Sequence, residues 1–100
     1  MPFVKVADVK DIAEGSGKVV EANGKPIALF KVDGNIHAID NTCLHRGGPL
    51  GEGSLDANAV TCPLHGWRFD VTNGQCLTIP TMKVQSYAVK VEGNDVLVDA

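Results

Sequence analysis

Hydrophobic side chains along this chain of 100 residues occur in short β-type runs that are separated by turn-forming residues. No stretch shows the three-to-four-residue spacing that is typical of a long amphipathic helix. The pattern therefore predicts an all-β domain of short strands. The expected strands cover residues 3–6, 18–22, 27–32, 36–40, 59–61, 67–70, 87–91 and 96–98.

Turn-forming residues separate these strands. Asn23-Gly24, Asp33-Gly34-Asn35, Asn73-Gly74 and Gly93-Asn94 all contain residues that tolerate the positive φ of tight turns. Two short strands joined by such a turn form an antiparallel hairpin. We therefore expect antiparallel sheets, formed from both ends of the chain.

The middle of the chain has a different character. Glycine and proline crowd the stretch 41–53, which contains Gly47, Gly48, Pro49, Gly51 and Gly53. Such a composition predicts loops rather than strands. We expect a single domain over residues 1–100, with a strand-rich base of about residues 1–40 and 77–100 and an inserted, loop-rich subdomain of about residues 41–76.

The overall charge is small and negative. Nine basic and twelve acidic residues give −3 at pH 7, with a sequence pI of about 5.4. This balance argues against nucleic acid or an anionic membrane as a partner, because both favour clustered Lys and Arg. No apolar stretch is long enough for a membrane span, and the N-terminal residues lack the apolar core of a signal peptide. The expected location is the cytoplasm.

The cysteines point to metal chemistry. The chain has three of them, and an odd number in a short chain without a secretory signal does not predict a disulfide framework. Two of the three lie beside histidines, in the fragments Cys43-Leu44-His45 and Cys62-Pro63-Leu64-His65. In a reducing compartment this arrangement indicates a metal site.

The two fragments supply four candidate ligands: Cys43, His45, Cys62 and His65. Two thiolates and two imidazoles could hold one structural zinc ion. They could also hold two sulfide-bridged irons, with both cysteines on one iron and both histidines on the other. Zinc fingers commonly place two cysteines in one loop and two histidines in another, whereas each fragment here contributes one of each. The spacing favours the binuclear cluster and leaves zinc as the alternative.

The residues around these ligands resemble a known family. The stretches CLHRGGPL from Cys43 and CPLHGWRFD from Cys62 resemble the Rieske motif, in which C-x-H is followed after about sixteen residues by C-x-x-H. The resemblance covers the whole chain and implies three antiparallel sheets, with one 2Fe–2S cluster at the tip of the inserted subdomain. By analogy, the two cysteines would bind the buried iron and the two histidines the outer iron, near solvent. The segment 79–82 resembles the loop that covers the cluster in relatives.

The resemblance also bears on the reduction potential. High-potential relatives have a further cysteine in each ligand loop, joined as a disulfide, and the matching residues here are Gly48 and Leu64. Those relatives also place hydroxyl side chains where this chain has Trp67 and Phe69. Hydrogen bonds to a charged acceptor are worth roughly 1.5–3 kcal/mol, so their loss lowers the potential. We expect a low-potential cluster.

Other chemistry-bearing residues have simpler interpretations. Cys76 has no partner at ligand spacing and is expected to be a small, buried apolar residue. His37 lies in an alternating strand outside the motif, and Trp67 is expected to pack in the subdomain. Arg46 and Arg68 lie beside ligands, where they either form a docking or tuning patch or are solvated loop charges.

The resemblance implies a soluble single-electron carrier rather than an enzyme. The chain has no glycine-rich dinucleotide loop, and it lacks a second iron site of two histidines and a carboxylate. Similar small proteins are ferredoxin components of aromatic-ring oxygenases, which carry electrons from a flavin-dependent reductase to a terminal oxygenase. We expect a monomer that docks both partners near His45 and His65. The alternatives are the small subunit of an assimilatory nitrite reductase and a structural zinc module that mediates protein contacts.

Overall fold

The computed structural model describes residues 3–43, 48–64 and 66–100. It confirms the predicted all-β fold. The strands are β1 (Val4–Asp8), β2 (Gly17–Ala22), β3 (Lys25–Val32), β4 (Asn35–Asp40), β5 (Ser54–Asp56), β6 (Ala59–Thr61), β7 (Arg68–Asp70), β8 (Ser86–Tyr87), β9 (Val89–Glu92) and β10 (Asp95–Val98). Two short 3₁₀ turns, η1 (Val9–Asp11) and η2 (Leu50–Glu52), accompany them. Within the described ranges no helix is long and apolar enough to cross a membrane.

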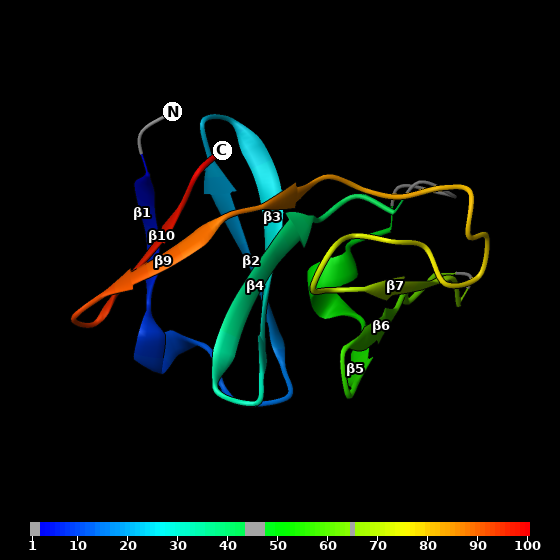
Figure 1. The fold of residues 1–100 in the computed structure, drawn as a ribbon, viewed down its shortest axis with the longest axis horizontal. Coiled ribbons are helices and arrows are strands. Elements are labelled where there is room, and N and C mark those ends of the chain that lie inside the picture. Colours follow the sequence, from blue (N-terminus) through cyan, green and yellow to red (C-terminus); the bar gives the residue numbers. More distant parts are fainter. Residues whose placement is uncertain (1–2, 44–47, 65) are drawn as a thin grey trace.

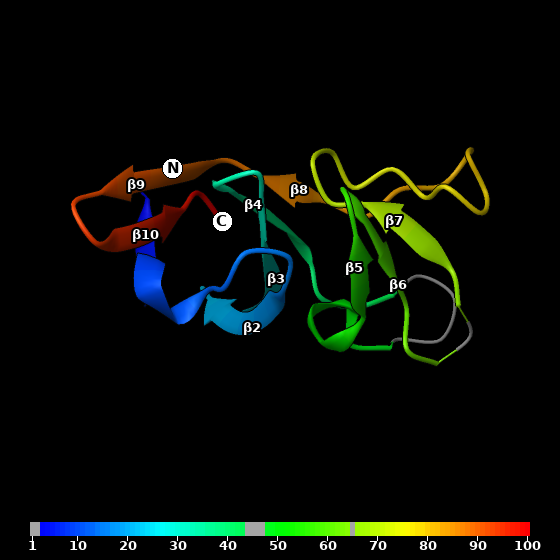
Figure 2. The same cartoon turned by 90° about the horizontal axis from the view of Figure 1, so that it is seen from below.

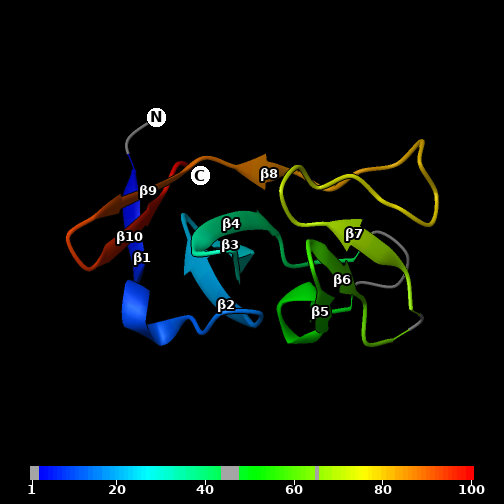
Figure 3. The same cartoon turned by 60° about the horizontal axis from the view of Figure 1, so that its bottom comes forward.

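Three antiparallel sheets lie side by side along the long axis of the molecule (Figures 1 and 2). The terminal sheet has the order β1-β10-β9, the central sheet β2-β3-β4-β8 and the small sheet β5-β6-β7. We call residues 41–84, which contain the small sheet and its loops, the small-sheet half. The terminal sheet occupies the opposite end (Figure 3). The expected division into a base and an inserted subdomain stays a prediction.

Two tight hairpins set the register of the central sheet. In the β2–β3 turn, Asn23 and Gly24 have φ of 51° and 76°, and in the β3–β4 turn Asp33 and Gly34 have φ of 51° and 79°. Positive φ at both central residues is the geometry that matches the twist of paired strands. The predictions of these two turns are confirmed.

Strand β3 is buried on both faces, because the central sheet is the middle layer. Successive side chains of a strand point to opposite faces. Ala28 and Phe30 belong to a core shared with the small-sheet half, whereas Ile27 and Leu29 belong to a core shared with the terminal sheet. One strand thus couples the two hydrophobic cores.

The strand expected over residues 87–91 is divided in the structure. Tyr87 pairs with Ala38 of the central sheet, whereas Val89 pairs with Val98 of the terminal sheet. The chain therefore changes sheets at Ala88. Residue alternation continues through this point, so the sequence pattern does not reveal the change of partner. The short strand β5 was also not predicted.

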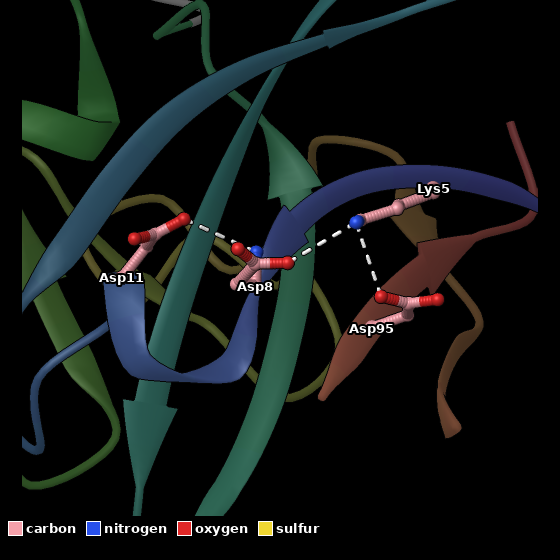
Figure 4. Close-up of polar contacts among 4 residues, drawn as sticks. All are labelled: Lys5, Asp8, Asp11 and Asp95. Carbon is pink, nitrogen blue, oxygen red and sulfur yellow. Dashed lines mark hydrogen bonds and ion pairs between the residues drawn. The ribbon is translucent and has the colours of Figure 1, made fainter. Parts of the chain in front are cut away.

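Charged side chains join β1 to its surroundings at the surface (Figure 4). The Lys5 ammonium lies 3.1 Å from a carboxylate oxygen of both Asp8 and Asp95, and the Asp8 amide donates to the Asp11 carboxylate at 3.2 Å. Hydrogen bonds to Asp95 and Asp8 raise the pKa of Lys5 above its usual value. Because these groups are exposed, the ion pairs contribute little to stability.

Candidate metal centre

The first ligand loop begins where β4 ends. The Leu50 amide donates a hydrogen bond to the Asn41 carbonyl at 2.7 Å, and the Cys43 amide donates to the Gly48 carbonyl at 2.9 Å. These two bonds draw the ends of the loop together. Backbone geometry therefore positions Cys43 at the neck of the loop, while His45 lies outside the described residues.

Asn41 also closes this loop with its side chain. Its Oδ1 accepts a hydrogen bond from the Gly51 amide at 2.8 Å, and its backbone N–H donates to the Pro26 carbonyl of β3 at 3.1 Å. Apart from the cysteines, Asn41 is the one buried residue with a polar side chain among the residues that the structure describes. Buried polar groups stabilise a fold only when they are hydrogen-bonded. Asn41 thus ties the ligand loop to the central sheet, a role that the sequence analysis missed.

The second ligand loop is the hairpin between β6 and β7. The Cys62 amide donates to the Trp67 carbonyl at 2.7 Å, and the Gly66 amide donates to the Cys62 carbonyl at 3.1 Å. Gly66 has φ of 78°, a conformation that favours glycine. The predicted ligand His65 lies outside the described residues.

The two loops face each other. Cys43 and Cys62 are both buried and belong to the same core. A Cβ placed on Gly48 of the first loop would lie 2.7 Å from the Cys62 sulfur and 3.0 Å from Cγ of Leu64 in the second loop. The glycine therefore lets the backbone of the first loop pack closely against this sulfur. Of the four predicted ligands, the structure places Cys43 and Cys62 in the same core. His45 and His65 lie outside the described residues.

This arrangement fits a 2Fe–2S cluster. Thiolates are soft ligands suited to iron–sulfur centres, and burial of both cysteines keeps water away from the sulfurs. Because position 48 carries no side chain, the first loop approaches the Cys62 sulfur closely, which brings the two predicted ligand loops together. A 2Fe–2S cluster held between two such loops would exchange one electron at a time.

Three other candidates lie around this centre. Cys76 is a free, buried thiol whose Sγ accepts a hydrogen bond from the Ile79 amide at 3.3 Å, and it packs in the core with Cys43 and Cys62; its burial was predicted. Trp67 packs against the same core. Arg68 is exposed and forms no ion pair with the residues that the structure describes. Arg46 lies outside those residues.

His37 stands apart from the centre. It is half-buried on β4, pairs with Phe30 across the central sheet and lines an open cavity of about 420 Å³ with Glu14 and Asn58. Within the described part of the chain, no three His, Cys, Asp or Glu side chains converge to hold a metal ion. The assignment of His37 as an ordinary strand residue agrees with this position.

Known proteins share both the sequence and the fold. The Rieske [2Fe-2S] domain matches residues 2–88. The ferredoxin component of a naphthalene 1,2-dioxygenase system from Pseudomonas aeruginosa is 41% identical over 98 residues, which are 97% of this chain and 94% of that protein.

Two solved structures extend the likeness. A complex of reduced oxygenase and oxidized ferredoxin in carbazole 1,9a-dioxygenase contains a chain that matches with a TM-score of 0.87 and 31% identity, over 96% of this chain and 91% of that one. A protein described as a nitrite reductase NADPH small subunit matches with a TM-score of 0.87 and 25% identity, over 100% of both chains. The same fold thus occurs in a dioxygenase complex and in a protein described as a reductase subunit.

Proposed function

The chain belongs to the Rieske [2Fe-2S] domain family, and from this premise we propose that it is the ferredoxin component of a multicomponent aromatic-ring dioxygenase system. In that role it holds one 2Fe–2S cluster, passes single electrons and is not itself catalytic. Two observations support the proposal. The chain is similar to a ferredoxin component over nearly its whole length, and its two proposed ligand loops bury Cys43 and Cys62 in the same core.

The proposed ligands are Cys43, His45, Cys62 and His65. A cluster bound there would supply a centre that accepts and releases one electron. The protein contributes the positioning of the loops. The Gly48 and Trp67 carbonyls hold the two cysteine amides, and the surrounding core excludes water from the sulfurs.

The proposed partners are a flavin-dependent reductase and a terminal oxygenase, which dock near His45 and His65. The similar chain in the carbazole dioxygenase complex supports an oxygenase partner. We place the protein in the cytoplasm as a monomer, since a mobile carrier visits two partners in turn. Size-exclusion chromatography coupled to light scattering tests the oligomeric state, and a dimer would contradict it.

The cluster is proposed to have a low potential. Gly48 and Leu64 lie next to each other across the two loops, and neither can form the disulfide of the high-potential relatives. Phe69 is buried in the core and carries no hydroxyl group. We expect a midpoint in the lower part of the Rieske window of roughly −150 to +300 mV. A redox titration followed by electron paramagnetic resonance measures it, and a midpoint above about +100 mV would refute the assignment.

Reconstitution tests the function directly. The anaerobically purified holo-protein is combined with the reductase and terminal oxygenase of a naphthalene 1,2-dioxygenase system, NADH and naphthalene. Wild-type protein should restore product formation, and the Cys62→Ala variant should not. A colourless protein that carries zinc would exclude the cluster. Support of nitrite reduction without ring hydroxylation would favour the nitrite reductase subunit.

A further inference from the structure

The chain has three steps in which asparagine or aspartate precedes glycine: Asn23-Gly24, Asp33-Gly34 and Asn73-Gly74. At such a step the backbone nitrogen of the glycine can attack the side-chain carbonyl carbon of the preceding residue, because glycine has no Cβ to hinder the approach. The product is a five-membered cyclic imide. Whether a folded protein permits this reaction depends on the conformation of the step and on the hydrogen bonds of the glycine amide.

A hydrogen bond holds the glycine amide at two of these steps. The Gly34 amide donates to the Glu14 carboxylate at 2.8 Å, and the Gly74 amide donates to the Asp70 carbonyl at 2.7 Å. Among the residues that the structure describes, the Gly24 amide has no such acceptor, and both residues of this first step are exposed to water. The attacking nitrogen is therefore available at the first step alone.

The backbone conformation of Asn23 also suits the reaction. Its φ of 51° is the positive φ that the first central residue has in both hairpin turns, type I′ and type II′. In the imide, Cβ and the backbone carbonyl carbon of Asn23 share one ring with the Gly24 nitrogen, which sets ψ of Asn23 to about −120°, the ψ of this position in a type II′ turn. Ring closure thus converts one hairpin turn into the other. The pairing of Ala22 with Lys25 beside the turn is retained.

Asn73 differs from Asn23 in each of these respects. It is not among the described residues that have a positive φ. Its Oδ1 accepts a hydrogen bond from the Gln75 amide at 2.8 Å, so its side chain is already engaged. Gly74 is buried, and its carbonyl accepts a hydrogen bond from the Val84 amide at 2.9 Å. Ring closure there would break hydrogen bonds on both sides of the step, so the folded protein protects Asn73.

The side-chain amide of Asn23 has a structural partner that the reaction would remove. Its Nδ2 donates a hydrogen bond to the Ala100 carbonyl, which brings Ala100 to the β2–β3 turn (Figure 1). Ala100 is 8% exposed and belongs, with Ala22, to the core shared with the terminal sheet. A carboxylate at position 23 offers no donor and would face the carbonyl oxygen of Ala100. Conversion of the amide to a carboxylate therefore removes the contact that holds Ala100.

We propose that Asn23 is a site of spontaneous deamidation that releases Ala100 from the β2–β3 turn. The Gly24 nitrogen forms a bond to Cγ of Asn23, and the side-chain nitrogen leaves as ammonia together with the amide proton of Gly24. Water then opens the imide, and cleavage at Cγ gives aspartate whereas cleavage at the backbone carbonyl gives isoaspartate. Either product adds one carboxylate, so the net charge of −3 becomes −4. The reaction uses no residue of the candidate metal centre and does not depend on the proposed function.

Mass spectrometry of the purified protein, fresh and after storage at mildly alkaline pH, tests the site. Trypsin releases Asn23 in the peptide 19–31, in which the Lys-Pro bond resists cleavage, and Asn73 in the peptide 69–83. The first peptide should gain one dalton about tenfold faster than the second, because the second reacts only after local unfolding. In the urea-unfolded chain the two rates should become similar. Equal rates in the folded protein, or a faster reaction at Asn73, would overturn the proposal.

Two variants at each asparagine separate the reaction from its consequence. Asn23→Gly keeps a residue that accepts a positive φ, so the more acidic form that develops during storage should disappear from anion exchange, whereas Asn73→Ser should retain it. Asn23→Asp imitates the product. In this variant the Asp99 amide, which donates to the Ala88 carbonyl at 3.1 Å, should exchange hydrogen about fivefold faster, the factor for one hydrogen bond worth about 1 kcal/mol. Asn73→Asp adds the same charge and should leave this exchange unchanged.

Each part of the proposal has its own contrary result. Persistence of the acidic form in Asn23→Gly would place the reaction at another residue. Unchanged exchange of the Asp99 amide in Asn23→Asp would show that the Asn23 contact does not hold Ala100. Electron transfer by the fresh protein bears on the proposed function alone, because the reaction at Asn23 requires no cluster.

Discussion

The central sheet and the small-sheet half are built in different ways. Strand β3 makes six residue pairs with each of its neighbours, β2 and β4. The strands of the small sheet are only three residues long, and each pairing between them has three residue pairs. Repetitive backbone pairing thus holds the central sheet, while loops and individual side-chain contacts hold much of the small-sheet half.

Glycines show the same contrast. Gly24 and Gly34 in the central hairpins have positive φ, and a Cβ there would meet no neighbouring atom within 4 Å. At Gly48, Gly53 and Gly74, in the small-sheet half, a Cβ would come closer than 3.0 Å to another atom. Glycine thus serves local turn geometry in the two central hairpins and close packing at these three positions of the small-sheet half. Gly17 of β2, which is closely packed, and Gly66, which has a positive φ and no neighbour within 4 Å, depart from this division. The small-sheet half therefore depends more on contacts between distant residues and on its bound cluster.

The largest difference between the two regions is expected in hydrogen exchange after the cluster is removed. Cys62→Ala should abolish iron binding and electron transfer, because it removes one proposed ligand. Hydrogen exchange should then become fast in the small-sheet half and stay slow in β3 and β4. Cys76→Ala is the control and should retain iron and sulfide. Equal loss of protection in both regions would show that they unfold as one unit.

Replacing three glycines with alanine, one at a time, compares the stability that depends on close packing with the stability that depends on turn geometry. At Gly74 a Cβ would lie 2.2 Å from the Val84 carbonyl oxygen, and φ is 81°, so strain and clash combine to destabilise the protein by about 3 kcal/mol. At Gly53 the distance to the Thr61 carbonyl oxygen is also 2.2 Å but φ is −77°, and we expect about 2 kcal/mol.

Gly34→Ala introduces only the backbone strain of a positive φ, with an expected cost of about 1 kcal/mol. Urea unfolding of the three holo-proteins measures the free energies. A larger loss for the alanine at Gly34 than for that at Gly53 would reverse the comparison.

Asn41 joins the two regions. Its replacement should reduce the free energy of unfolding by an amount between those expected for alanine at Gly74 and at Gly34. Asn41→Leu fills a similar volume but leaves the buried Gly51 amide without its acceptor, which should destabilise the protein by about 2 kcal/mol. Asn41→Asp keeps an acceptor oxygen and should recover part of this loss. Asn58→Ala removes an exposed amide and should change stability by less than about 0.5 kcal/mol. Equal stabilities for the Leu and Asp variants would argue against the role of the hydrogen bond.

The smallest effect on stability is expected from the titration of Tyr87, in the central sheet, at high pH. The Tyr87 hydroxyl donates to the Asp40 carboxylate at 2.5 Å, and burial together with this carboxylate raises the pKa of Tyr87 to about 12. The folded protein therefore keeps the phenol proton where the unfolded chain, with a pKa near its ordinary value of about 10, loses it. This contribution to stability is complete below pH 10 and is lost as the pH rises toward 12.

Tyr87 is the single tyrosine, so the ultraviolet absorbance of tyrosinate reports its titration directly. Tyr87→Phe should remove this part of the pH dependence of unfolding. A tyrosinate midpoint near 10 in the folded protein would contradict the raised pKa.

Local sequence rules were sufficient for the central sheet. Short β-type runs and the Asn-Gly and Asp-Gly turns predicted β2, β3 and β4, and the structure extends each by only one or two residues. The motif also predicts Cys43 and Cys62 as ligands; both lie in the same core, and their role as ligands stays a prediction. These features depend on residues that are close in sequence or on a recognisable spacing.

Other features depend on partners that the local pattern does not contain. The change of sheets at Ala88 is set by Ala38 and Val98, which lie far from each other in the sequence. The hydrogen bond from Gly51 to Asn41 and the one from Gln75 to Pro80 join residues across loops. Asn41 belongs to no motif, and the Asn-Gly-Gln-Cys turn of the resemblance names no contact for Gln75, so both contacts emerge only from the folded chain.

The two-sided strand β3 gives the molecule an internal reference for spectroscopy. Leu29 and Phe30 are adjacent in the chain but belong to different cores. A fluorine label on the Phe30 ring would therefore sense events around the metal, while a labelled methyl group on Leu29 would record the opposite core. Comparing the two signals in one sample would distinguish a local redox response from a change of the whole protein.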